Sequence, residues 1–252
     1  MTNDEGLTRL EWGITTMRIL AIGNSFSEDA TCYLQRISQG ELYVRNLYIG
    51  GCSLEKHIEC FTGDLKEYDF QKDGKALRKI SIREALSYKD WDFITVQQVS
   101  GLSGIEDSFE PYLGQLISHI KKSNPSAKII LHKTWAYEHD STHQEFVRYD
   151  NNQKVMYEKI GKVSEHYAEK YSLPIIPAGD AVQKLRTEVE EFDYLRGGRS
   201  LCRDGYHLTF DYGRYAVALI WYRFFTGNPI TEVKYAPRGT KKRIIDIIKS
   251  TI

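Results

Sequence analysis

The sequence lacks the features that mark a membrane protein or a nucleic-acid-binding protein. No stretch approaches the apolar length of a membrane span. Lys and Arg together number 34, as do Asp and Glu, so no excess of one sign attracts nucleic acid or an anionic membrane. We therefore expect neither as a partner, and the oligomeric state stays open.

Paired cysteines are also missing. None of the four forms a CxxC motif, so a redox or zinc motif of that kind is absent: Cys32, Cys52, Cys60 and Cys202. A disulfide between Cys52 and Cys60 is an alternative, but buried free thiols are favoured. His139 and His143 have the spacing of a zinc-binding helix, yet no third ligand is evident. The sequence predicts no metal and no cofactor.

Residues 1–16 lack a basic start followed by an apolar run and do not form a secretory signal. This favours a cytoplasmic location. Hydrophobic residues make up 41% of the chain and charged residues 27%, as in ordinary globular proteins. With no Pro-, Gly- or Ser-rich linker and no internal repeat, we expect 1–16 to be an extension and 17–252 a single domain.

Five short apolar runs are typical of buried parallel strands, at 18–22, 42–49, 92–97, 128–132 and 174–177. Helical patterns lie between or after them, at 30–39, 81–87, 111–122, 145–171 and 210–225. This alternation predicts an α/β fold, a five-stranded parallel sheet with helices on both faces. Asp73-Gly74 within 68–79 predicts a β-hairpin over the edge of the sheet. A basic cluster at 238–243 is typical of a solvated helix face.

Ligands of such a sheet bind at the carboxyl ends of its strands. The residues that follow the first four predicted strands include amides, hydroxyls, glycines and aromatic rings: Asn24 and Ser25, then Gly50 and Gly51, then Gln97, Gln98 and Ser100, then Trp135 and Tyr137. Asp204 and His207 come just before the last predicted helix.

These residue types are the parts of a serine hydrolase. Ser25 supplies a hydroxyl that becomes nucleophilic when a base takes its proton, and His207 is a base with a suitable pKa. Asp204, three residues earlier, can orient the other ring nitrogen. The N–H groups of Ser25 and Gly51 and the amide of Gln98 are candidate donors to the oxyanion.

The motifs resemble those of the SGNH hydrolases, also called GDSL-type esterases. "IGNSFS", a glycine after the second strand, "WDFITVQQVSGLSG", "TWAY" and "DGYHLTFDYGRY" occur in the family's order from about residue 17 to 227, and look like an uncharacterised bacterial branch. The resemblance implies a flavodoxin-like three-layer α/β/α fold and metal-free ester hydrolysis by a Ser-His-Asp triad. It also implies carbohydrate deacetylation.

The third family motif departs from the pattern, because its asparagine is missing here. Gln98 is the favoured replacement, and Gln97 and Ser100 are the alternatives. With Asn24, these residues and the aromatic pair Trp135 and Tyr137 are expected to line the substrate cleft. For the aromatic pair, a loop that covers the core is an equal alternative.

Other functions are compatible with the same residues. Ser25 could be only a helix N-cap, and the chain could then be a catalytically silent ligand-binding module. A thioesterase or lysophospholipase is the alternative among enzymes. A nucleotide binder is disfavoured because the loop after the first strand lacks a glycine-rich phosphate cradle.

Overall fold

The computed structural model describes residues 16–252 and contains one sheet in the order β4-β3-β2-β1-β5-β6-β7. The strands are β1 Met17–Gly23, β2 Leu42–Tyr48, β3 Tyr68–Lys72, β4 Lys75–Ile80, β5 Phe93–Val96, β6 Lys128–His132 and β7 Ile175–Ile176. Five of them pair in parallel, in the order β2-β1-β5-β6-β7. This is the predicted flavodoxin-like arrangement.

The predicted number of five strands is wrong, because the hairpin belongs to the sheet. β3 pairs antiparallel with β2, and β4 pairs antiparallel with β3. Asp73 and Gly74 both have positive φ, as a tight hairpin turn requires. Tyr68 and Phe70 are buried in the core, so β3 extends the sheet rather than crossing over its edge.

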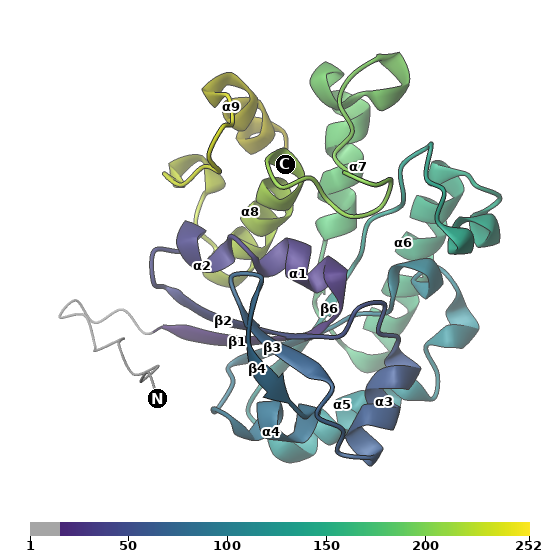
Figure 1. Ribbon diagram of the computed structural model, residues 1–252, viewed down its shortest axis with the longest axis vertical. Coiled ribbons are helices and arrows are strands. Elements are labelled where there is room, and N and C mark those ends of the chain that lie inside the picture. The colour runs from purple at the N-terminus through teal and green to yellow at the C-terminus, as the bar shows by residue number, and fades with distance from the viewer. Residues whose placement is uncertain (1–15) are drawn as a thin grey trace.

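Helices cover both faces of the sheet (Figure 1). The first face packs against α1 Ser25–Thr31, α2 Leu34–Ile37, α7 Ala178–Glu188, α8 Tyr212–Thr226 and α9 Lys242–Thr251. The second packs against α3 Leu54–Thr62, α4 Ile82–Ser87 and α5 Tyr112–Ser123. α6 Gln153–Tyr171 contributes side chains to both cores.

Short 3-10 turns connect several of these elements: η1 Ser100–Leu102, η2 Glu106–Ser108, η3 Gln144–Tyr149, η4 Glu190–Phe192, η5 Tyr194–Arg196 and η6 Ile230–Glu232. The pattern at 145–171 is therefore divided into η3 and α6, and that at 30–39 into α1 and α2. α1 begins earlier than expected, because Asn24 caps its first turn.

The helices α3 and α7 were not predicted, and α9 was expected only as a solvated helix face at 238–243. The expected solvated face at 238–243 leads into α9, whose other face is buried through Ile244, Ile245 and Ile248. α7 lies backbone to backbone against the loop after β6. A Cβ on Gly179 would lie 2.1 Å from the Thr134 carbonyl oxygen, so only glycine fits there.

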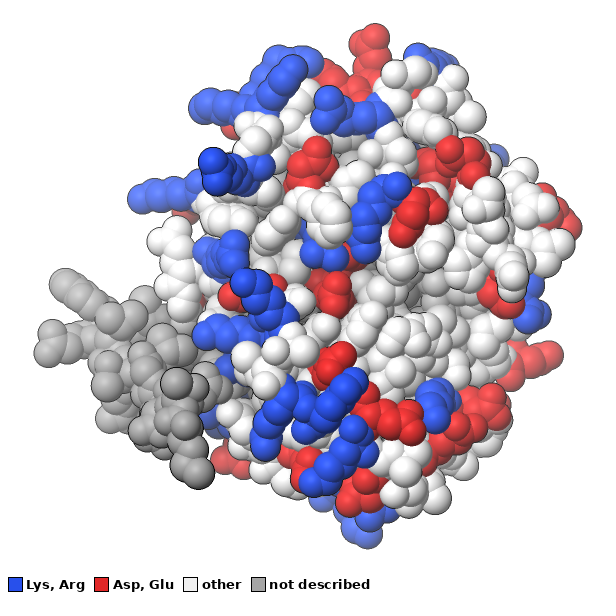
Figure 2. Space-filling model, viewed as in Figure 1, with Lys and Arg blue, Asp and Glu red and all other residues white. Residues whose placement is uncertain are grey.

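All four cysteines are free and buried, as favoured. Within 16–252, no helix has the length and apolar character needed to cross a membrane. Basic and acidic side chains are interspersed over the face seen in Figure 2. The expected extension at 1–16 lies, apart from Thr16, outside the described residues.

Candidate active site

Ser25 is the first residue of α1, at the point where β1 ends. Asn24 is the N-cap, with extended backbone, and its Oδ1 accepts a hydrogen bond of 3.0 Å from the Phe26 N–H. Asn24 and Phe26 are buried, whereas Ser25 between them is partly exposed. Within the part of the chain that the structure describes, the Ser25 hydroxyl makes no hydrogen bond. The N-cap of α1 is therefore Asn24, and capping does not account for a serine at position 25.

A buried chain of neutral hydrogen bonds fixes this turn against three other strand ends. Gln97 Nε2 donates to Asn24 Oδ1 at 2.9 Å, and His132 Nδ1 lies 2.8 Å from Gln97 Oε1. Asn24 Nδ2 donates to the Cys52 carbonyl at 3.0 Å. Burial lowers the pKa of His132 to about 3, so the ring is neutral at pH 7 and its Nδ1–H donates to Gln97. The ends of β1, β2, β5 and β6 are thereby tied together.

The turn after β2, which contains Gly51, is bonded to the end of β1 on both sides of this glycine. The Ile49 N–H reaches the Gly23 carbonyl, and the Asn24 amide holds the Cys52 carbonyl on the other side of Gly51. Gly51 is exposed and has φ of +62°, a conformation that favours glycine. Two backbone donors, the N–H groups of Ser25 and Gly51, therefore lie at adjoining strand ends.

Asp204 and His207 form a hydrogen-bonded pair in the loop before α8. Asp204 Oδ2 lies 2.7 Å from His207 Nδ1, and Oδ1 accepts the His207 backbone N–H at 2.7 Å. Burial by itself would raise the pKa of Asp204, but the hydrogen bonds from His207 outweigh it and the pKa is lowered. The carboxylate stays ionised and holds the proton of the ring on Nδ1, which leaves Nε2 as the basic nitrogen.

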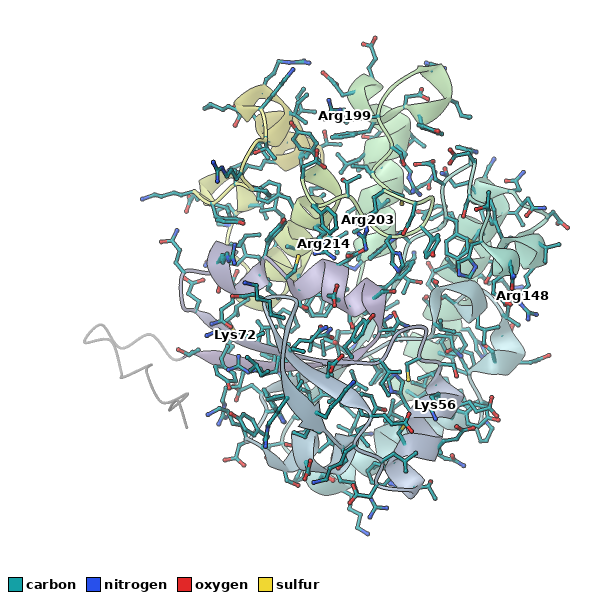
Figure 3. The ribbon with its side chains drawn as sticks, viewed as in Figure 1. Lys56, Lys72, Arg148, Arg199, Arg203 and Arg214 are labelled. Atoms are coloured by element: carbon teal, nitrogen blue, oxygen red, sulfur yellow. The ribbon has the colours of Figure 1, made fainter. Side chains whose placement is uncertain are left out.

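The helix that starts at Ser25 also holds the His207 loop. Asp29, fully buried on α1, accepts the Leu208 N–H at 2.7 Å and pairs with Arg203 and Arg214. Figure 3 shows both guanidinium-bearing residues above α1. Ser25 and Asp29 are four residues apart and therefore share a face of the helix. That face is the one that meets the loop next to His207.

Ring contacts place His207 at the beginning of α1. The rings of His207 and Phe26 have centroids 6.2 Å apart, and Phe26 stacks on Trp135 at 4.2 Å. The Trp135 indole donates to the Tyr206 carbonyl at 2.8 Å. Among the described residues, His207 and Ser25 share no hydrogen bond. Catalytic hydrogen bonds are often long before a substrate binds.

Two predictions about the site need correction. Gln98 Nε2 donates to the Ser108 carbonyl and Oγ, and Gln98 Oε1 accepts from the Leu54 N–H, so this amide is committed within the protein. It is not a free oxyanion donor. Trp135 and Tyr137 are 0% exposed and form part of the core, which agrees with the alternative of a loop that covers the core and not with that of an open cleft.

The remaining candidates for substrate contact are buried as well. Asn24 is 1% exposed, Gln97 1% and Ser100 5%, and the Ser100 hydroxyl lies 2.9 Å from that of Tyr137. These side chains pack beneath the site in the protein interior and do not line its surface.

Two partly exposed rings beside His207 were missed as site residues. The Tyr206 ring lies 4.3 Å from that of His207 and 4.7 Å from that of His143. Tyr206 lies inside the "DGYH" motif, and this position between Asp204 and His207 could have indicated that Tyr206 belongs to the site. His143 was considered only as a metal ligand with His139, and His139 is exposed. No three His, Cys, Asp or Glu side chains within 16–252 are grouped to hold a metal.

Comparisons with known proteins identify the family and the fold of this chain. The model of a family described as a domain of unknown function, DUF4886, matches residues 18–252. A DUF4886 family protein from Bacteroides uniformis is 35% identical, with a TM-score of 0.85 over 94% of this chain and 93% of that one. The search of curated proteins gives no match.

More distant structures show the fold. A protein described as a candidate SGNH hydrolase, from Slackia heliotrinireducens, is 18% identical with a TM-score of 0.58, over 84% of this chain and 100% of that one. An acetyl xylan esterase is 13% identical with a TM-score of 0.53, over 81% and 98%. This chain therefore has the α/β/α fold of the SGNH hydrolases.

Proposed function

We propose that this chain, which belongs to the DUF4886 family, is a serine esterase that hydrolyses small acyl esters, with acetyl esters of carbohydrates as the favoured class. One observation carries the proposal. Asp29, on the face of α1 that begins with Ser25, accepts the N–H of Leu208, the residue that follows the Asp204–His207 pair. A helix cap alone would not require a base oriented by a carboxylate at this place.

The reaction follows from these positions. Ser25 Oγ attacks the ester carbonyl carbon while His207 Nε2 takes the hydroxyl proton, and the carbonyl electrons move to oxygen. His207 then gives the proton to the leaving alcohol as the C–O bond breaks. Water, deprotonated by His207, attacks the acyl-enzyme and releases the acid and Ser25. Asp204 keeps His207 in the required tautomer throughout.

The oxyanion is assigned to the N–H groups of Ser25 and Gly51. The first N–H groups of a helix have no partner within the helix, and the helix N-terminus favours negative charge. The exposed Gly51 turn offers the second donor without a side chain in the way. Of the three donors expected from the sequence, this arrangement keeps the two backbone N–H groups and leaves out the Gln98 amide.

The substrate class is supported by the surroundings of His207. Tyr206 and His143 present partly exposed ring faces beside the base, which suits the apolar face of a sugar ring. The fold is also used by an acetyl xylan esterase, although that likeness by itself concerns the fold.

Two measurements test the proposal together. We expect the protein to hydrolyse p-nitrophenyl acetate and a fluorophosphonate probe to add one label, seen as a mass increase of the intact protein. Ser25→Ala should reduce hydrolysis to background and abolish labelling. Ser87→Ala is the matched control. Ser87 ends α4 on the other face of the sheet, and its exposed hydroxyl bonds to the Arg83 carbonyl of the same helix, so this variant should keep labelling and turnover.

Hydrolysis and labelling unchanged in Ser25→Ala would overturn the proposal and favour a binding module on the same fold. An active enzyme should then be offered acetylated xylooligosaccharides and p-nitrophenyl esters of increasing chain length. A preference for long acyl chains would indicate a thioesterase or lysophospholipase instead of an esterase that acts on acetylated carbohydrates.

A further inference from the structure

Two loops that lie far apart in the sequence meet at Gly205, two residues before His207. The Glu138 N–H, in the loop after β6, donates to the Gly205 carbonyl at 2.7 Å. Gly205 has φ of +85°, and a Cβ at this position would lie 2.9 Å from the Cα of Ser141, so main chain packs on main chain here. His143 follows Ser141 by two residues. The contact therefore holds the segment that leads to His143 against the segment that leads to His207.

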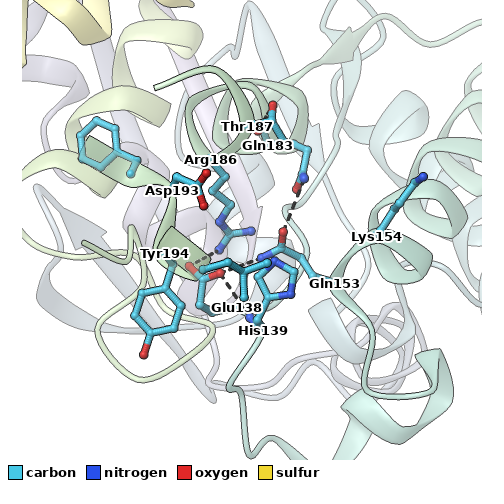
Figure 4. Close-up of a pocket in the computed structure, with 11 residues that line it drawn as sticks. Glu138, His139, Gln153, Lys154, Gln183, Arg186, Thr187, Asp193 and Tyr194 are labelled. Carbon is cyan, nitrogen blue, oxygen red and sulfur yellow. Dashed lines mark hydrogen bonds and ion pairs between the residues drawn. The ribbon is translucent and has the colours of Figure 1, made fainter. Parts of the chain in front are cut away.

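Glu138 fixes the start of the first loop in the protein interior. Its side chain forms a buried ion pair with Arg186 at 3.4 Å and accepts from Gln153 Nε2 at 2.7 Å (Figure 4). These contacts are internal to the protein, and they anchor the loop that carries His143.

The ring of His143 is oriented by its neighbours. It packs on Tyr137, with centroids 4.8 Å apart, and edge-on against Tyr206 at 4.7 Å. Its Nδ1 accepts the Glu145 N–H at 3.2 Å, so the proton of the neutral ring is on Nε2. Burial lowers the pKa of His143, and the positive charge that His207 can carry acts in the same direction, against the Glu145 carboxylate. The ring is therefore neutral at pH 7, and its Nε2–H is a donor.

The Nε2 of His143 is accessible to a ligand. It has no hydrogen-bond partner among the described residues, and it retains accessible surface, unlike the Nε2 atoms of His57 and His132, which are buried in the core. The hydroxyl of Tyr206 is likewise accessible and has no partner within 16–252. Tyr206 packs against His207, and His143 against Tyr206. Two polar atoms near the base can thus be reached by a bound molecule.

The order of the strands indicates which half of an ester these rings meet. The carbonyl oxygen is assigned to the N–H groups of Ser25 and Gly51, at the ends of β1 and β2. β6, which leads to His143, lies on the other side of β1, with β5 between them. The leaving oxygen takes its proton from His207 Nε2, so the alcohol half of the ester must lie against His207. The rings beyond His207, away from the oxyanion donors, therefore adjoin the alcohol.

We propose that His143 selects the alcohol half of the substrate, an inference that rests on the serine esterase proposed above. His143 Nε2–H donates to the oxygen of a hydroxyl group next to the ester, and the Tyr206 hydroxyl bonds to the same region of the alcohol. The substrate class is then a neutral monoacyl ester of a polyol with a free hydroxyl beside the ester. An alcohol without that hydroxyl displaces water from Nε2–H and supplies no acceptor in its place.

Two acetates that differ in a single group test this inference. 2-Hydroxyethyl acetate has a hydroxyl where propyl acetate has a methyl group. We expect the parent protein to favour the hydroxyethyl ester about tenfold in kcat/KM, the effect of one hydrogen bond. The difference should lie mainly in KM, because this bond is made in the ground state as well as in the transition state. Equal kcat/KM values for the two esters would overturn the inference.

His143→Phe and His143→Gln separate the donor from the structural role of the ring. Both remove Nδ1, the acceptor of the Glu145 N–H, but only glutamine keeps an N–H donor in place of Nε2–H. His143→Phe should lose the tenfold preference, and His143→Gln should retain most of it. His143→Leu also lacks the donor and replaces the phenylalanine variant if thermal unfolding shows that the latter does not fold. An equal loss of preference in the glutamine variant would overturn the inference.

His139→Phe is the matched control. His139 is exposed on the same loop and lines a separate cavity between α6 and α7, so this variant should keep the preference of the parent (Figure 4). All of these variants should still hydrolyse p-nitrophenyl acetate and take up the fluorophosphonate label, because neither reaction uses a hydroxyl on the alcohol. Retained hydrolysis with an unchanged preference in His143→Phe would overturn this inference alone. Absence of both hydrolysis and labelling in the parent would instead overturn the esterase proposal.

Discussion

The two halves of the candidate active site are built in opposite ways. On the nucleophile side, Asn24, Gln97 and His132 form a buried network of neutral side chains. On the base side, Asp204 and His207 lie in a partly exposed loop that is held by charges, through Asp29 with Arg203 and Arg214. The nucleophile is thus positioned by neutral hydrogen bonds inside the sheet, and the base by a buried carboxylate that is paired with two partly buried arginines.

This difference has a physical consequence. A neutral buried network is insensitive to salt but depends on every hydrogen bond being made. A loop held by buried ion pairs loses much stability when one charged partner is removed, because the other charge is left unpaired. We therefore expect activity and stability to be lost through broken hydrogen bonds on the nucleophile side and through removed charges on the base side. The following variants test that contrast in order of expected effect.

Asp204→Asn should have the largest effect. An amide facing His207 Nδ1 donates a proton instead of accepting one, so the ring must carry its proton on Nε2 and cannot take that of Ser25. We expect kcat on p-nitrophenyl acetate to fall about 10⁴-fold. The melting temperature should change little, because the Asp204 side chain is 39% exposed. A loss of less than tenfold would contradict the role given to Asp204.

Asp29→Asn should be the most damaging change to stability. It leaves Arg203 and Arg214 without their buried carboxylate, and removing one partner of a buried ion pair costs about 3–5 kcal/mol. Urea unfolding should show this loss together with reduced turnover. Asp246→Asn is the control. It breaks the exposed pair with Lys242 on α9, which should cost at most about 0.5 kcal/mol. Equal effects of the two variants would mean that the charges on Asp29 do not hold the loop.

Gln97→Leu and Gln98→Leu separate the two adjacent amides. Each leaves buried partners unsatisfied and should cost about 1–3 kcal/mol of unfolding free energy. Only Gln97→Leu should also lower kcat, by about tenfold to 10²-fold, because Gln97 positions Asn24 beside Ser25. Gln98 binds Ser108 and Leu54 instead. A large kcat loss in folded Gln98→Leu would restore the oxyanion role that its hydrogen bonds argue against.

Acid should destabilise the fold through two buried rings, His132 of the neutral network and His57 on α3. Burial lowers the pKa of His132 and of His57 to about 3, against about 6.5 in an unfolded chain. Stability from these rings is complete above pH 6.5 and is lost as the pH falls toward 3, because the unfolded chain takes up the protons first. The loss is about 1.4 kcal/mol per pH unit for each ring.

Urea unfolding at pH 7.5, 5.5 and 4.5 measures this slope. The stability gap between the parent and His132→Gln should narrow by about 1.4 kcal/mol per pH unit below 6.5, since the variant has one such ring fewer. A gap that is constant with pH would show that His132 is not held neutral.

The sequence predicted the parts of the fold that have strong local signals. Most of the five parallel strands are short runs of β-branched and apolar residues, and all five are present. α3 was missed because its buried positions include His57 and Cys60, which do not form an obvious apolar stripe. The hairpin was predicted, but its pairing with β2 depends on contacts with distant residues and could not be inferred locally.

The site was predictable to a similar extent. The Asp204–His207 pair spans one turn of the chain, and the hydrogen bond between them follows from their spacing. The direction in which Gln98 points is decided by Ser108, ten residues away, so the amide assignment failed. Asp29 was not considered at all, because its partners lie more than 170 residues further along the chain.

The backbone contact at Gly179 fixes how α7 lies against the loop after β6. A side chain of any size at this position would collide with the Thr134 backbone, so at this point main chain packs directly on main chain. The separation of helix and loop here cannot be adjusted by the rotation of a side chain. A change in this separation would require α7 to move as a whole.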